Sequence, residues 1–241
     1  MPIVATAAFI VTIDGPAGTG KSTVAHRLAC RLGLEFLDTG AMYRAAALCA
    51  LDRGIDPADA ARVAALVRGL AMRFDWQADP PELLVDGVAV GDRIRSQAVT
   101  RAVSLVASHP DVRAAMVRLQ RAIAASHPRL VTEGRDQGSV VFPDAHVRIY
   151  LDAQPEVRAR RRVEQLRLKG IETTEPEVLA QILERDRLDR ARRDGPLVCP
   201  RGAFVVDTSS IGADEVIDRL EEIVRREAGD RAASGDGALG T

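Results

Sequence analysis

One segment of eight residues constrains the fold of this chain more than any other feature. Residues 15–22 read GPAGTGKS and fit the pattern G-x-x-x-x-G-K-[ST]. Glycines let such a loop curl until its backbone N–H groups point inward at phosphate oxygens. The segment lies between an apolar, β-branched run at 8–13 and a helical pattern that begins at Ser22 and stops at Gly33. A strand, a phosphate-binding loop and a helix therefore follow one another, and the start of the helix faces the phosphate.

The loop predicts a site for ATP and Mg²⁺. Lys21 is expected to reach the β- and γ-phosphates, and the Ser22 hydroxyl is expected to ligate the magnesium ion. The chain has 33 basic residues but only two lysines, so a lysine at this place stands out. The residues expected to contact ATP are Gly15, Pro16, Ala17, Gly18, Thr19, Gly20, Lys21, Ser22 and Thr23.

Short apolar runs alternate with helical patterns over most of the chain. The strand patterns lie at 8–13, 34–37, 130–132, 147–151 and 204–206. The helical patterns lie at 22–32, 41–52, 57–70, 95–108, 110–125, 155–169, 176–193 and 213–227. Asp56-Pro57 is interpreted as the cap and first residue of the third helix. The alternation predicts an α/β fold of three layers with a central parallel sheet.

The alternation is interrupted between 71 and 92. Two short apolar runs there flank Asp86-Gly87, which predicts a hairpin in a small antiparallel sheet. The expected domain organisation is a core of residues 1–70 and 128–228 with a helical lid at about 155–195, an insert of residues 71–127, and a disordered tail at 229–241.

Composition excludes several classes of protein. The net charge of -1 lacks the basic excess of a nucleic-acid binder, and no run of about 20 apolar residues predicts a membrane span. The four histidines show no metal-ligand spacing, so we expect no zinc site. Cys30, Cys49 and Cys199 are irregularly spaced, which predicts reduced thiols that pack as small buried side chains. We expect a cytoplasmic monomer that binds neither nucleic acid nor membrane.

The loop alone leaves several kinds of nucleotide-binding protein open. A GTPase reads guanine with an Asn-Lys-x-Asp element, and this chain contains no asparagine. A motor ATPase has a later strand that ends in Asp-Glu or similar, which LVTEGRD at 130–136 matches only loosely. A small-molecule kinase is the simplest class that remains.

Three further segments resemble the bacterial cytidylate kinases. They read DTGAMYR at 38–44, EGRDQGSVVFPDA at 133–145 and R-D-x-x-D-x-x-R at 185–192. The resemblance runs from about residue 8 to residue 225, and the second string is specific to that family; Gln137 within it is polar where the family usually has an apolar residue. The resemblance implies transfer of the γ-phosphate of ATP to CMP or dCMP, a step of pyrimidine metabolism, with the insert binding the monophosphate.

The resemblance also implies roles for individual residues. The residues that would hold the acceptor phosphate are Thr39, Arg44 and Arg135, and Tyr43 would pack against the acceptor nucleotide. The residues that would read cytosine are Ser104, Arg113 and Asp136. Arg185 and Asp189 would lie at the ribose hydroxyls. The lid arginines that would neutralise the transferred phosphoryl group are Arg158, Arg161, Arg162 and Arg192, acting with Lys21 and Arg135.

The chemistry of cytosine agrees with these implied roles. The base offers an amine donor at N4 and acceptors at N3 and O2. The Asp136 carboxylate can accept from the amine, while Arg113 and Ser104 can donate. Uracil has a carbonyl oxygen in place of the amine, and a site built from polar groups rejects such a mispaired analogue strongly.

Two other functions stay open on the sequence. One is a different small-molecule kinase on the same scaffold, such as a UMP or shikimate-type kinase. The other is a non-enzymatic ATP- or RNA-binding module that uses the arginine-rich helices. Aromatic residues make up only 3% of the chain and do not interleave with those arginines, which counts against RNA.

Overall fold

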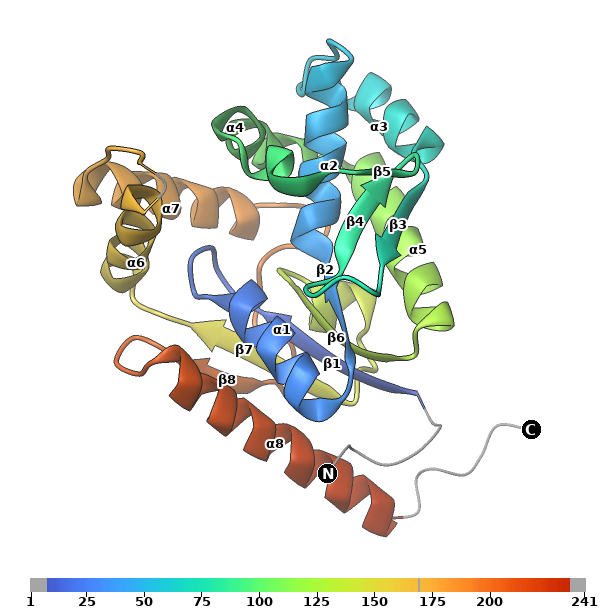
Figure 1. Cartoon of the computed structure of the whole chain (residues 1–241), viewed down its shortest axis with the longest axis vertical. Coiled ribbons are helices and arrows are strands. Elements are labelled where there is room, and N and C mark those ends of the chain that lie inside the picture. Colours follow the sequence, from blue (N-terminus) through green and yellow to red (C-terminus); the bar gives the residue numbers. More distant parts are fainter. Residues whose placement is uncertain (1–7, 169, 235–241) are drawn as a thin grey trace.

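A five-stranded parallel sheet forms the centre of the molecule (Figure 1). The computed structural model describes residues 8–168 and 170–234. The strand order is β2-β6-β1-β7-β8. The strands are β1 (Phe9–Asp14), β2 (Glu35–Asp38), β6 (Arg129–Gly134), β7 (Val147–Asp152) and β8 (Phe204–Asp207). The predicted parallel sheet is confirmed, and the strand that leads into the phosphate-binding loop is its central strand.

Helices cover both faces of this sheet. On one face, α1 (Lys21–Leu32) and α8 (Ala213–Ser234) pack in a core that includes Val131. On the other face, α2 (Thr39–Asp52) packs in a core that includes Leu130. Consecutive residues of β6 thus enter opposite cores, because side chains alternate across a strand. Burial on both faces explains why these strands are continuous apolar runs, and the predicted three layers are confirmed.

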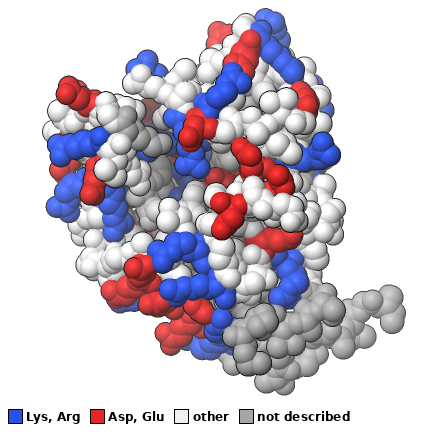
Figure 2. All heavy atoms as spheres, viewed as in Figure 1, with Lys and Arg blue, Asp and Glu red and all other residues white. Residues whose placement is uncertain are grey.

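Charged side chains join α1 to α8 along their exposed edge. The Arg27 guanidinium lies 2.5 Å from an Asp214 carboxylate oxygen, and Arg31 lies 2.5 Å from Asp218. Figure 2 shows the acidic and basic side chains intermingled where the two helices meet. Exposed pairs of this kind add little to stability, so the apolar contacts beneath them hold the two helices together.

The insert carries the predicted antiparallel sheet. Its strands are β3 (Met72–Asp75), β4 (Glu82–Val85) and β5 (Val88–Ala89). The turn between β4 and β5 places Asp86 at φ 51° and Gly87 at φ 82°, which is the turn expected for a two-residue hairpin. The helices around the sheet are α3 (Ala60–Gly69), α4 (Gln97–Val106) and α5 (Pro110–Ser126). The hairpin prediction is confirmed.

Two helices form a hairpin beside the phosphate-binding loop, in the segment predicted to be a lid (Figure 1). They are α6 (Pro155–Arg167) and α7 (Glu175–Arg190). A small core of their own holds them together, made of Ala159, Val163, Val178 and Ile182. A capping box between Thr174 and Glu177 begins α7. The segment is therefore a helix pair with a small core of its own, and its open end contacts the phosphate-binding loop.

Several helix boundaries differ from the prediction, and two of the differences have a clear physical reason. The third helix begins at Ala60 rather than Pro57, because the Asp59 carboxylate accepts a hydrogen bond from the Arg62 N–H and caps it. The interpretation of Asp56 as the cap was wrong: it accepts from the Ala58 N–H in the preceding turn. The last helix continues to Ser234, past the expected end of the ordered chain, since one interior glycine costs a helix only about 1 kcal/mol. The remaining tail residues lie outside the described ranges.

The three cysteines are free thiols, and the prediction that they are buried was wrong. Cys30 and Cys199 are exposed, and Cys49 is partly buried. Within the described part of the chain, no helix combines the length and the hydrophobicity that a bilayer crossing requires.

Candidate active site

The phosphate-binding loop runs from the end of β1 to the first residue of α1. Gly15 has φ 150°, and a Cβ atom at this position would lie 2.0 Å from the Leu151 carbonyl oxygen. The loop therefore passes directly against β7, and only glycine fits at its first position. The backbone N–H groups at the start of α1, together with the helix dipole, favour an anion in the loop.

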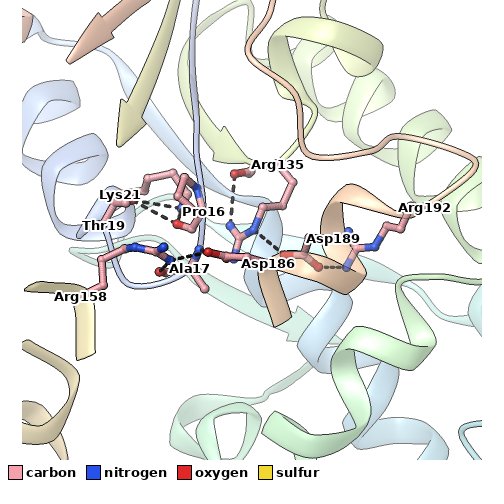
Figure 3. A network of polar contacts seen from close by, with 10 residues as sticks. Pro16, Ala17, Thr19, Lys21, Arg135, Arg158, Asp186, Asp189 and Arg192 are labelled. Carbon is pink, nitrogen blue, oxygen red and sulfur yellow. Dashed lines mark hydrogen bonds and ion pairs between the residues drawn. The ribbon is translucent and has the colours of Figure 1, made fainter. Parts of the chain in front are cut away.

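Lys21 lies across this loop (Figure 3). Its Nζ donates hydrogen bonds to the Pro16 carbonyl oxygen at 2.7 Å and to the Thr19 hydroxyl at 3.4 Å. Burial, assisted by the positive charge of Arg135, lowers the pKa of Lys21 to about 7. A phosphate group would supply the missing negative charge and restore the protonated ammonium.

A buried ion pair connects both α6 and α7 to the phosphate-binding loop (Figure 3). The Arg158 guanidinium on α6 donates to the Ala17 carbonyl oxygen at 2.9 Å and to the Asp186 carboxylate on α7 at 2.6 Å. Asp186 in turn accepts from the Ala17 N–H at 3.4 Å. Arg158 was expected among the arginines that neutralise the phosphoryl group, but its side chain binds the loop backbone. Asp186 was not predicted, because an Arg-Asp dipeptide in a charged helix carries no local signal of a buried pair.

Oxygen ligands gather beside Ser22. Its hydroxyl donates to a Glu133 carboxylate oxygen at 2.8 Å, at the end of β6. Asp38, at the end of the neighbouring β2, caps α2 by accepting from the Ala41 N–H at 2.8 Å. Burial and the negative charge of Glu133 raise the pKa of Asp38 to about 7. Two carboxylates and a hydroxyl are the hard oxygen donors that Mg²⁺ prefers, so this set fits a magnesium ion.

The Asp14 carboxylate links the loop to the segment after β6. It accepts hydrogen bonds from the N–H groups of Gln137 at 2.8 Å and Gly138 at 2.7 Å. Those residues begin one π-helical turn, Gln137–Val141, which was not predicted. Burial, opposed by the two backbone hydrogen bonds, raises the pKa of Asp14 to about 7. Gln137, which is polar where the family usually has an apolar residue, has a hydrogen-bond partner here. Its side-chain amide oxygen accepts from the Thr132 hydroxyl at 3.0 Å.

A pocket opens between α2, α4, α5, α7 and the end of β6. All ten residues predicted to bind the acceptor line it: Thr39, Tyr43, Arg44, Ser104, Arg113, Arg135, Asp136, Arg185, Asp189 and Arg192. They come from positions that are up to 153 residues apart in the sequence, and the fold brings them to one place.

Arg113 and Asp136 form an ion pair in this pocket. Each side chain is 4% exposed, and the Arg113 guanidinium lies 5.7 Å from the centre of the Tyr43 ring. Gly195 packs against the pair, since a Cβ atom there would lie 2.0 Å from an Arg113 nitrogen. Burial raises the pKa of Asp136, and the charge of Arg113 opposes that rise.

Arginines outnumber carboxylates on the side of the pocket that faces the phosphate-binding loop. Asp189 is 1% exposed and pairs with both Arg135, at 2.9 Å, and Arg192 (Figure 3). Arg185 is partly buried, and its buried Nε has no hydrogen-bond partner among the described residues. Burial and the charge of Arg135 lower the pKa of Arg185 to about 9. The excess positive charge makes this side of the pocket suitable for a phosphate dianion.

Two predicted catalytic arginines, Arg161 and Arg162, are not among the residues that line the pocket. Arg161 donates to the Thr208 carbonyl oxygen at 2.5 Å and to its hydroxyl at 3.2 Å, in the loop after β8. The structure therefore does not bring Arg161 to the pocket, because these hydrogen bonds hold its side chain at the loop after β8. Arg162 is about half buried, and burial with the charge of Arg95 lowers its pKa.

A similar fold occurs in a kinase of known structure. The crystal structure of a gluconokinase from Sinorhizobium meliloti 1021 superposes with a TM-score of 0.52 at 15% identity, covering 94% of this chain and 97% of that chain. Together with the phosphate-binding loop, this likeness defines a P-loop kinase fold. A family model described as cytidylate kinase matches residues 11–226. The chain therefore belongs to the cytidylate kinase family, as the sequence resemblance predicted.

Curated relatives support the same family. The chain is 46% identical over 217 residues to the cytidylate kinase of Mycobacterium avium, covering 90% of this chain and 95% of the relative. It is 46% identical over 224 residues to that of Rhodococcus opacus, covering 93% and 98%.

Removal of the negative charge of Asp186 is expected to loosen the loop. Asp186→Asn leaves the Arg158 charge buried without its partner, which should lower the free energy of unfolding by about 3–5 kcal/mol and raise the KM for ATP. Urea unfolding and steady-state kinetics measure both effects. The matched control is Glu184→Gln, which removes an exposed ion pair of the same helix and should change neither quantity appreciably. Equal unfolding free energies for the two variants would contradict the role of Asp186.

ATP binding is expected to take up a proton above pH 7. The pKa of Lys21 is about 7 in the free protein, so the ammonium loses its proton as pH rises through 7, and a bound phosphate restores it. Affinity for ATP should therefore fall as pH rises from 7 to 9. Calorimetry at pH 8 in two buffers of different ionisation enthalpy measures the number of protons taken up when ATP binds. The native chain should take up about one proton per ATP, and the Lys21→Met variant should take up about one proton fewer than the native chain. The same proton count in both proteins would contradict this.

Proposed function

We propose that this protein transfers the γ-phosphate of ATP to CMP or dCMP and forms ADP with CDP or dCDP. The observation that carries the proposal is the buried Arg113–Asp136 pair in the acceptor pocket, next to the arginine-rich side that faces the phosphate-binding loop. Membership of the cytidylate kinase family supports both the donor and the reaction.

The acceptor base would lie against three polar groups. The Asp136 carboxylate would accept from the N4 amine of cytosine, while Arg113 and the Ser104 hydroxyl would donate to O2 and N3. Tyr43 would pack beside the base, since its ring is already in contact with Arg113. With uracil, the O4 oxygen would face the Asp136 carboxylate, and the two partial negative charges would repel each other. The carboxylate would also lack the hydrogen bond that it accepts from the N4 amine of cytosine.

The acceptor phosphate would lie among the arginines. Arg44 and Arg135 would hold it together with the Thr39 hydroxyl, and Arg185 would supply a partly buried charge whose Nε is free to donate. Asp189 pairs with both Arg135 and Arg192 and so keeps them in position, and with Arg185 it would lie at the ribose hydroxyls.

The reaction needs no general base. The second pKa of a phosphate monoester is about 6, so the acceptor is mostly dianionic at pH 7 and already nucleophilic. The work of the protein is then to align the two phosphates and to stabilise charge during an in-line transfer. Lys21 would bind the β- and γ-phosphates, and Arg135, Arg162 and Arg192 would neutralise the transferred group.

A magnesium ion would be held by Ser22, with Glu133 and Asp38 close to it. When bound, the ion would supply positive charge to the β- and γ-phosphate oxygens of ATP.

The free thiols of Cys30, Cys49 and Cys199 fit a reducing compartment, and we propose that the enzyme acts in the cytoplasm, as a monomer.

An acceptor panel tests the reaction. ADP release from ATP and Mg²⁺ is measured with CMP, dCMP, UMP, AMP, GMP or shikimate, and CMP and dCMP should give a kcat/KM at least tenfold above that of UMP. Activity on another acceptor alone would keep the kinase and reject the base-reading residues. ATP binding without turnover on any acceptor would favour a non-enzymatic module.

Asp136→Asn tests the assignment of the base. An amide can present either an oxygen or an NH₂ group, so the variant should accept both pyrimidines and lower the CMP-to-UMP ratio of kcat/KM at least tenfold. The KM for ATP should stay unchanged, which separates lost selectivity from lost folding. Asp144→Asn, at an exposed position of the same motif, is the matched control. An unchanged ratio in a folded Asp136→Asn protein would reject the role of Asp136.

A further inference from the structure

Three side chains of different chemistry meet where α1 contacts the insert. The ligand atoms of His26, Cys30 and Asp79 all lie within 4.8 Å of one another. His26 and Cys30 are four residues apart on α1 and so share one face of the helix. Asp79 comes from the connection between β3 and β4, which lies beside α1 in Figure 1. The cluster is thus built from two separate parts of the fold.

The spacing is close to that of a metal site. The Cys30 sulfur lies 3.6 Å from His26 Nε2, and an Asp79 carboxylate oxygen lies 2.5 Å from the same nitrogen. Ligands bound tetrahedrally to zinc at ordinary bond lengths stand about 3.3–3.8 Å apart. The sulfur and the nitrogen already have this separation. Asp79 needs to move by roughly 1 Å, and its side chain is 79% exposed, so it has room to do so.

The donor set suits a transition metal rather than magnesium. Imidazole nitrogen and thiolate sulfur favour Zn²⁺ and similar ions, whereas Mg²⁺ prefers oxygen ligands such as those beside Ser22.

We propose that His26, Cys30 and Asp79 bind one Zn²⁺ or a similar transition-metal ion, with water in the fourth position. His26 would bind as the neutral imidazole through Nε2, and Cys30 would release its thiol proton on binding. The ion ties α1 to the insert. Because α1 begins at Lys21, this contact joins the helix that carries the phosphate-binding loop to the part of the fold that holds the acceptor pocket.

Cobalt titration tests the site in the full chain. Co²⁺ is added to the reduced protein in excess Mg²⁺, which occupies oxygen-only sites, and the thiolate-to-cobalt absorption band is followed. One equivalent of Co²⁺ should produce the band. Added Zn²⁺ should displace the Co²⁺, and the band should then disappear. A protein that shows no band at stoichiometric Co²⁺ would overturn the proposal.

Substitutions assign the ligands. Cys30→Ser should abolish the band, and His26→Gln and Asp79→Asn should each weaken binding at least tenfold. The controls are Cys199→Ser, at another exposed thiol, and His127→Gln, at another histidine that pairs with a carboxylate. Both controls should bind as the native chain does. A band that persists in Cys30→Ser, or affinity unchanged in Asp79→Asn, would reject the site that joins α1 to the insert.

Discussion

The hydrogen bonds that the Asp14 carboxylate accepts connect the two halves of the active site. Asp14 is fully buried at the end of the central strand and directly precedes the phosphate-binding loop. Its two oxygens accept from Gln137 and Gly138, and so fix the turn that follows β6. Arg135 and Asp136 directly precede that turn in the sequence. The phosphate-binding loop and the pocket residues Arg135 and Asp136 therefore share one anchor, and a shift of one would disturb the other.

Charge is distributed unevenly in this nearly neutral chain. The net charge is -1, yet the acceptor pocket is lined by five arginines against three carboxylates. Burial lowers the pKa of Lys21 and of Arg185, so the positive groups are held in an environment that disfavours their charge. An anionic substrate relieves this cost, which is how a chain without a basic surface can favour highly charged ligands.

Much of the fold and of the acceptor pocket could be predicted from the sequence, because both depend on local patterns. Apolar runs located every strand of the parallel sheet, and short motifs contain eight of the ten lining residues. The other two, Ser104 and Arg113, were assigned through the family resemblance alone. Contacts between residues far apart in the sequence produce no local sequence pattern, so they were not predicted. Asp186 pairs with a residue on another helix, Arg161 is held by a loop 47 residues away, and Asp79 meets His26 across 53 residues. The cap at Asp59 was missed because Asp56-Pro57 gives an equally good local signal.

The Arg158–Asp186 pair lies near the start of α6 and near the end of α7, so the helix hairpin is held at its open end. If the hairpin rotated about this pair, the turn between α6 and α7 would move farthest, because it is the part most distant from the pair. Arg185 and Asp189 lie on α7 beside the pair and would move least. Changes of length or sequence in that turn would therefore alter how far the hairpin reaches and would leave the pocket residues of α7 in place.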